Sequence, residues 1–172
     1  METQEIRKGH IKPFWNEVYQ YLAYHREPFN DPESIALWRS QGRTGTFEGL
    51  MADMRNPQPY WNHIFIEYFQ ALGWKSVATS YYKMETGNCL PTHRDLYTRY
   101  INLNNLKGKE KSIYRAIIYL EDWKEGHWSE YAGQPFTYWR AGDYVIWQWD
   151  YPHAAGNDGV EPRYTLQMTG YK

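Results

Sequence analysis

The chain has 172 residues and a formal net charge of -1, which fits one domain with a substantial core. A net charge this close to zero does not suggest a basic surface that would bind nucleic acid or an anionic membrane. The single cysteine excludes an internal disulfide and a thiolate zinc site, and it is typical of a reducing compartment. No apolar run approaches the roughly 20 residues of a membrane span. We therefore expect a cytoplasmic protein without nucleic-acid or membrane partners.

Residues 1–74 are expected to be mainly helical. Apolar residues recur at helical spacing over 13–24, which predicts a first helix. Pro32 directly after Asp31 is typical of a helix start, with the aspartate as N-cap. Residues 60–73 show the strongest helical pattern in the chain. We expect these helices to buttress one sheet of the fold.

From residue 75 the apolar period changes to two, which predicts strands. Aromatic residues make up 19% of the chain, and we expect most of them to fill the core of a small β structure. The strand candidates cover residues 75–84, 111–120, 134–139, 143–149 and 163–171. Helices followed by many short strands predict an α+β protein. We expect a single domain over 1–172, whose core at 75–172 is a double-stranded β-helix (a cupin-like jelly roll).

Three residues in two places predict a metal centre. His93 and Asp95 form an H-x-D pair after the first strand candidate, and alternate residues of an extended segment share one face. His153 follows on a later strand. Two imidazoles and one carboxylate are the ligand set of a facial non-haem Fe(II) site, which keeps positions open for substrate and O2.

Two further features bear on this centre. His127, which forms an E-x-H pair with Glu125, is the rival ligand, and we expect it beside the cleft rather than on the metal. Arg163 follows His153 by ten residues, enough for a turn and a neighbouring strand to bring it close to the metal. A guanidinium there can hold the far carboxylate of a dicarboxylic cosubstrate through two parallel hydrogen bonds.

These motifs over residues 75–171 resemble those of the Fe(II)/2-oxoglutarate-dependent dioxygenases, especially the prolyl-hydroxylase-like branch. The resemblance rests on His93-x-Asp95, His153, Arg163-x-Thr165 and the run A-I-I-Y-L-E-D-W at 116–123. It departs from the family at Glu121 and Asp122, where an asparagine is common, and at Gly126-His127, where two glycines are common.

The resemblance implies a hydroxylase that uses Fe(II), 2-oxoglutarate and O2, with ascorbate as a candidate reductant, and that releases succinate and CO2. It implies that Arg163 binds the C5 carboxylate of the cosubstrate, with a hydroxyl from Thr165. Tyr119 and Tyr82 are the matching positions for tyrosines that contact the cosubstrate. A carboxylate at Asp95 favours hydroxylation over halogenation. The substrate is expected to be a peptidyl residue or a small molecule.

Two alternatives stay open. Another cupin-like metal enzyme would keep the triad without using 2-oxoglutarate. A non-catalytic jelly-roll binding module would use aromatic side chains such as Trp147, Trp149 and Tyr151, which share a strand face with His153. The basic residues of the 97–111 loop, together with Arg115 and Arg140, either meet an acidic substrate or are solvated.

Overall fold

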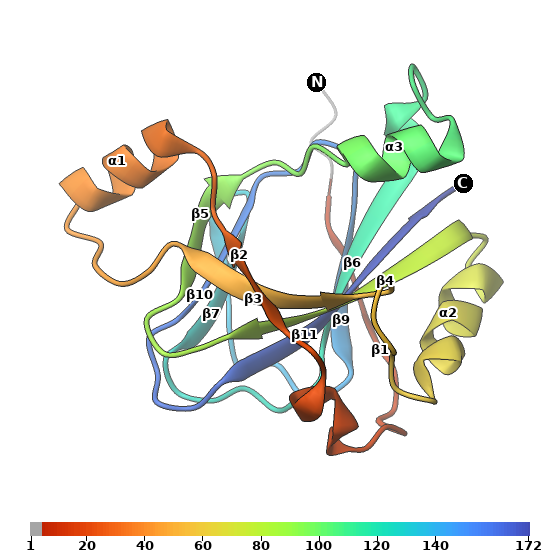
Figure 1. The fold of residues 1–172 in the computed structure, drawn as a ribbon, viewed down its shortest axis with the longest axis horizontal. Helices are drawn as coiled ribbons and strands as arrows, with labels where there is room; N and C mark the ends of the chain where they lie inside the picture. The colour runs from red at the N-terminus through yellow and green to blue at the C-terminus, as the bar shows by residue number, and fades with distance from the viewer. Residues whose placement is uncertain (1–4) are drawn as a thin grey trace.

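The computed structural model describes residues 5–172, which form two antiparallel sheets that face each other (Figure 1). The seven-stranded major sheet has the order β1 (Arg7–His10), β9 (Asp143–Gln148), β6 (Ile113–Tyr119), β11 (Arg163–Tyr171), β4 (Lys75–Met84), β3 (Glu48–Asp53) and β2 (His25–Pro28). The four-stranded minor sheet has the order β5 (Cys89–His93), β10 (His153–Asn157), β7 (His127–Tyr131) and β8 (Gln134–Phe136). The expected α+β double-stranded β-helix is confirmed.

Helices are few and short. They are α1 (Pro32–Ser40), α2 (Asn62–Ala71) and α3 (Thr98–Asn104), with 3₁₀ turns at η1 (Glu17–Tyr21) and η2 (Glu110–Ser112). Asp31 caps α1 as expected, because its side chain accepts hydrogen bonds from the backbone amides of Glu33 and Ser34. None of the helices in the described part of the chain is long and apolar enough to cross a membrane.

The expectation that residues 1–74 are mainly helical is wrong for the part described. This segment supplies three strands of the major sheet, β1 on one edge and β2 with β3 on the other. The helix expected over 13–24 is only the 3₁₀ turn η1. Tertiary contacts override the helical spacing here: the Asn16 side chain accepts from the Trp61 indole at 2.9 Å, and Val18 and Tyr21 are exposed.

Helix α2 covers the outer face of the major sheet. Its side chains Phe65 and Phe69 are fully buried, and they join Tyr81 of β4 and Trp74 in one aromatic cluster. Burying each of these rings stabilises the fold by roughly 1.5–3 kcal/mol. Because this outer cluster supplies most of the core, the inner face of the sheet is free to carry polar side chains.

Candidate metal centre

A cavity of about 270 Å³ lies between the inner faces of the two sheets. Strand β11 shows how the sequence builds its wall, since successive side chains of a strand point to opposite faces. Tyr164, Leu166 and Met168 join the outer core. The alternate residues line the cavity, namely Arg163, Thr165, Gln167 and Thr169. One strand therefore serves both the core and the site.

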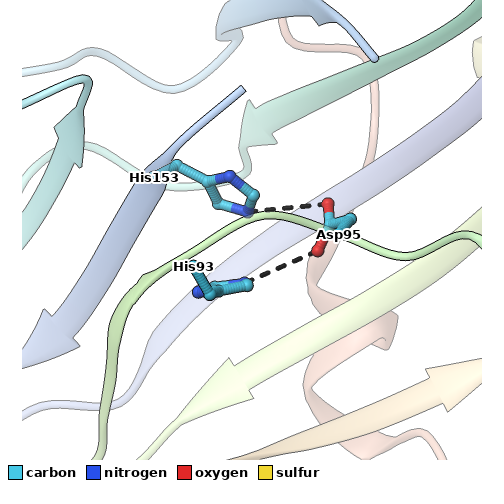
Figure 2. A group of neighbouring side chains, drawn as sticks. All are labelled: His93, Asp95 and His153. Atoms are coloured by element: carbon cyan, nitrogen blue, oxygen red, sulfur yellow. Dashed lines mark ion pairs between the residues drawn. The ribbon is translucent and has the colours of Figure 1, made fainter. Parts of the chain in front are cut away.

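His93 ends β5 and His153 begins β10, and the two residues pair across these neighbouring strands. Asp95 follows two residues after His93, so that its carboxylate lies beside both imidazoles (Figure 2). Its Oδ1 is 3.5 Å from Nε2 of His93, and its Oδ2 is 3.5 Å from Nε2 of His153. One ligand atom from each residue lies within 4.8 Å of the others. The structure thus brings together the three residues that the sequence selects.

Backbone carbonyls fix the tautomer of both imidazoles. Nδ1 of His93 lies 2.8 Å from the carbonyl oxygen of Pro91, and Nδ1 of His153 lies 2.9 Å from that of Tyr151. A carbonyl only accepts, so each Nδ1 carries the hydrogen and donates it. The Nε2 lone pairs then point toward Asp95, as a neutral histidine that binds a metal requires.

The electrostatics of the centre favour a cation. Burial opposes ionisation of Asp95, but the Arg115 guanidinium and the two imidazoles hold the pKa of this carboxyl well below its usual range. Burial lowers the pKa of His153 to about 4. Burial also opposes protonation of His93, but Asp95 outweighs it and raises the His93 pKa. The carboxylate therefore draws positive charge into the centre.

The donor set fits a divalent metal ion. Asp95 Oδ2 is buried without a hydrogen-bond partner, and a bound cation would satisfy it. Trp147 backs the centre, with its buried ring 4.6 Å from that of His153. His93, Asp95 and His153 are thus the residues that would hold Fe(II), and one side of the centre opens into the cavity.

Arg163 lies in the cavity wall with a residue exposure of only 4%. Its Nη2 donates to Ser129 Oγ at 2.6 Å, whereas its Nε is buried without a partner. The rings of Tyr119 and Trp139 lie 5.6 and 5.5 Å from its Cζ. None of the ion pairs found among residues 5–172 involves Arg163. A buried charge without a counter-ion is costly, so this part of the cavity favours an anion.

The other expected cosubstrate residues differ in their positions. Thr165 and Tyr82 pair across β11 and β4, and both line the cavity. Tyr119 lies behind the wall: its hydroxyl donates to Ser129 Oγ at 2.8 Å and lies 2.8 Å from the Tyr131 hydroxyl. Tyr119 therefore holds Ser129, which itself lines the cavity.

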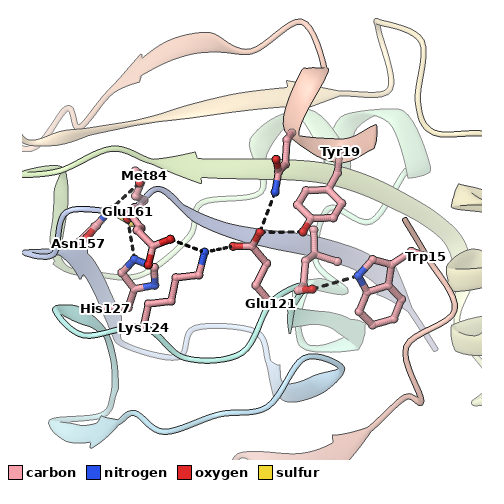
Figure 3. Close-up of polar contacts among 10 residues, drawn as sticks. Trp15, Tyr19, Met84, Glu121, Lys124, His127, Asn157 and Glu161 are labelled. Carbon is pink, nitrogen blue, oxygen red and sulfur yellow. Dashed lines mark hydrogen bonds and ion pairs between the residues drawn. The ribbon is translucent and has the colours of Figure 1, made fainter. Parts of the chain in front are cut away.

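His127 is separate from the centre. It is buried at the start of β7, where its Nε2 lies 2.8 Å from the Glu161 carbonyl oxygen (Figure 3). Burial lowers the pKa of His127. Nearby, Glu121 accepts hydrogen bonds from Tyr19 and Lys124, so it ties η1 to the end of β6. Both departures from the family pattern thus have structural contacts outside the cavity.

Sequence reasoning left Arg115 open between an acidic substrate and solvent, and it did not name Ser129 and Glu27, which also line the cavity. Arg115 is the most consequential, since its Nη1 lies 3.7 Å from Asp95 Oδ2. The period of two along β6 puts Arg115 on the same face as Tyr119, and this signal could have favoured the cavity over solvent. Ser129 and Glu27 carry no comparable signal, because they reach the cavity from other strands.

The sequence matches no known family model, and no curated protein is detectably similar to it. Among solved structures, the fold is similar to a Pseudomonas putida prolyl-4-hydroxylase, with TM-score 0.54, 12% identity, and coverage of 90% of this chain and 95% of that chain. It is also similar to a Burkholderia pseudomallei oxidoreductase of the 2OG-Fe(II) oxygenase family, with TM-score 0.56, 10% identity, and coverage of 90% and 75%.

A third similar structure is a predicted oxalate decarboxylase from Thermotoga maritima, with TM-score 0.50, 12% identity, and coverage of 90% of this chain and 96% of that chain. At such low identity these likenesses show a shared fold. The resemblance expected from the sequence is therefore confirmed at the level of the fold. Because one fold serves several chemistries, function has to be argued from the site.

Proposed function

We propose that this protein is a non-haem Fe(II)- and 2-oxoglutarate-dependent oxygenase that hydroxylates a C–H bond. The observation that carries the proposal is the buried Arg163 guanidinium, which has no carboxylate partner among the described residues and shares one cavity with the His93, Asp95 and His153 cluster. A metal enzyme without an anionic cosubstrate has no need of this charge in its cavity wall.

The hydrogen-bond donors around Arg163 support a carboxylate as its ligand. Ser129 Oγ accepts from both Arg163 and Tyr119, which uses its two lone pairs. The hydroxyl hydrogen of Ser129 and the Nε of Arg163 then remain as donors. Two such donors on one side of a cavity suit the C5 carboxylate of 2-oxoglutarate, since charge-assisted hydrogen bonds to a carboxylate are about twice as strong as neutral ones.

The balanced reaction takes one 2-oxoglutarate, one O2 and one substrate C–H, and it gives succinate, CO2 and an alcohol. One oxygen atom enters succinate and the other enters the hydroxyl group. When bound, Fe(II) supplies the O2 chemistry, and the protein supplies position and a dry cavity. His93, Asp95 and His153 would hold the metal, Arg163 and Ser129 would orient the cosubstrate, and Trp147 excludes water from one side.

The likeness in fold to a prolyl-4-hydroxylase and to a 2OG-Fe(II) oxygenase family member supports this proposal. It does not identify the substrate. Arg163 distinguishes the proposed oxygenase from the alternative more sharply than the fold does, because a cupin-like metal enzyme without 2-oxoglutarate would use the triad and would not use Arg163.

The test is anaerobic titration of the Fe(II)-loaded protein with 2-oxoglutarate, followed by its metal-to-ligand charge-transfer band in the visible spectrum. 2-Oxopentanoate is the matched control ligand, because it keeps the 2-oxo acid and lacks the far carboxylate that Arg163 would bind. We expect the band at much lower concentration with 2-oxoglutarate, and succinate release after O2 is admitted. Metal binding without a band or succinate would support the cupin-like alternative and refute the proposal.

A further inference from the structure

Two charged side chains of the cavity are neither candidate metal ligands nor among the residues proposed to bind the cosubstrate. They are Glu27 on β2 and Arg115 on β6, and both line the same cavity as the triad and Arg163. A substrate has to enter this cavity to reach the open side of the metal. These two charges are therefore the natural determinants of which substrate binds.

Arg115 lies far from Arg163 along the sheet. It pairs with Thr169 of β11, which is six residues beyond Arg163 on that strand. At about 3.3 Å per residue, the two backbone positions are roughly 20 Å apart. The two guanidiniums thus approach the cavity from opposite ends, and a cosubstrate held by Arg163 leaves Arg115 for a different anion.

The Arg115 guanidinium keeps donors for such a ligand. Its Nη1 contacts the Gln167 side-chain oxygen and lies 3.7 Å from Asp95 Oδ2. Its Nε is buried without a hydrogen-bond partner. The Tyr97 hydroxyl, against whose ring Arg115 packs at 4.8 Å, is also buried and unpartnered. A carboxylate that bound here would satisfy both groups.

Glu27 offers the opposite charge at the edge of the cavity. None of the ion pairs among residues 5–172 includes its carboxylate. Glu27 is exposed as a residue, and the partial burial of its carboxyl raises its pKa, so a cation placed beside it would stabilise the ionised form. Glu27 and Arg115 affect each other electrostatically, yet they do not form an ion pair. The space between them suits a molecule that carries both charges.

We infer that the substrate of the proposed oxygenase is a free α-amino acid, with its carboxylate on Arg115 and its ammonium on Glu27. This inference rests on the proposed function and narrows it. The contact between Arg115 and Asp95 puts the charged end of the substrate next to the metal ligands. The bonds within a few carbon atoms of that end are then the ones in reach for hydroxylation.

The size of the cavity agrees with a small substrate. At about 270 Å³ it is below the usual range of roughly 300–1,000 Å³ for ligand sites, and it has to hold the cosubstrate as well. An adjoining groove of about 490 Å³ shares Ser80, Tyr97, Arg115 and Thr169 with the cavity. This groove gives an amino acid a way in past Arg115.

The experiment uses the protein loaded with Fe(II) and 2-oxoglutarate without O2, so that binding is measured by calorimetry in the absence of turnover. The probes are the proteinogenic amino acids, and for those that bind, their α-amides, their N-acetyl derivatives and a terminally blocked peptide with the same side chain. We expect at least one free amino acid to bind. Blocking either charged group should weaken its binding at least tenfold, or about 1.4 kcal/mol. If no free amino acid binds, or if the blocked forms bind equally well, the inference is overturned.

Variants test which residue binds each charged group of the amino acid. For each variant, the affinity for the free amino acid is divided by the affinity for its α-amide or its N-acetyl derivative. In Arg115→Gln, the affinities for the free amino acid and for its α-amide should become nearly equal. In Glu27→Gln, the affinities for the free amino acid and for its N-acetyl derivative should become nearly equal. Arg140→Gln and Glu67→Gln, on exposed residues, are matched controls that keep both ratios. If Arg115 served only to orient Asp95, its loss would weaken metal and all ligands together and leave the ratio unchanged, which would refute its role.

Failure of this inference is distinguishable from failure of the proposed function. A protein that gives the 2-oxoglutarate charge-transfer band and binds only the blocked peptide is an oxygenase with a peptidyl substrate. A protein that gives no band fails at the earlier step. The two results come from the same loaded sample, so neither is mistaken for the other.

Discussion

Removal of the Arg163 guanidinium is the sharpest perturbation of the site. The structure shows a buried cation with one strong hydrogen bond, an unpartnered Nε and two aromatic neighbours. If it pairs with the cosubstrate in this setting, truncation to alanine should cost about 2–5 kcal/mol of binding, because one charge is left buried and unpaired. The dissociation constant of 2-oxoglutarate should then rise at least tenfold, and more than a hundredfold in the middle of that range.

Thermal denaturation of the metal-loaded protein measures this loss. A ligand present at 100 times its dissociation constant stabilises a protein by about 2.7 kcal/mol, and after a hundredfold loss of affinity only about 0.4 kcal/mol remains. For a protein of this size, 1 kcal/mol corresponds to roughly 2–4 °C in Tm. The rise in Tm on adding 2-oxoglutarate should therefore fall from about 5–11 °C to about 1 °C in Arg163→Ala.

Two further variants make the result interpretable. Arg163→Lys should recover only part of the shift, since lysine lacks the planar fork of donors. Arg140→Ala removes the same charge from an exposed position and should keep the full shift. An undiminished 2-oxoglutarate shift in Arg163→Ala would refute the role of this residue and with it the main argument for the cosubstrate.

The remaining predictions concern other groups of the site and fold. His153→Ala should lower Fe(II) affinity severely and abolish succinate release, whereas parent-like iron binding in calorimetry would exclude it as a ligand. Asp95→Asn should also lose succinate release, because an amide supplies no negative charge; near-parent release would mean that Asp95 only caps a turn. Ser129→Ala should weaken 2-oxoglutarate binding at least tenfold in the spectroscopic titration, since a hydrogen bond to a charged group contributes about 1.5–3 kcal/mol. Burial lowers the pKa of His127, so the unfolded chain binds more protons below about pH 6.5 and stability falls as pH falls. The free energy of unfolding of the metal-free protein, measured with denaturant at pH 7.5 and 5.5, gives the size of this loss. His127→Gln should make the loss smaller, by at most about 1.4 kcal/mol per pH unit. The exposed control His63→Gln should leave it unchanged.

The cluster of His93, Asp95 and His153 could be predicted from the sequence because its signal is local. His93 and Asp95 are two residues apart after a strand, and His153 sits in a second recognisable segment of strand and turn. Nothing in the sequence gives the register that puts His93 opposite His153, which depends on the pairing of β5 with β10. The residue types and spacing were therefore enough to select these residues but not to derive their geometry.

The N-terminal part shows where local patterns fail. Residues 48–53 form β3 although they carry no clear alternation, because β4 offers an unpaired edge to which they can bind. Residues 25–28 then add to β3 as the edge strand β2. The helical spacing over 13–24 is real, but its length is only at the lower limit of the roughly 12–15 residues that an isolated helix needs, so contacts with Trp61 and Leu120 decide its structure. Both errors arise from contacts distant in sequence.

The charges of the cavity explain why a buried site can hold so many ionic groups. Arg163 would pair with the far carboxylate of the cosubstrate, and Asp95 with the 2-oxo acid carboxylate would offset the doubly positive metal. Arg115 and the exposed Glu27 then remain with opposite charges. Burying charge is tolerable when opposite charges balance at short range. A zwitterionic amino acid leaves this balance intact, whereas a substrate with a net charge would leave one group of the cavity unpaired. The balance of charge that requires an anion beside Arg163 therefore also favours a substrate of zero net charge beside Arg115 and Glu27.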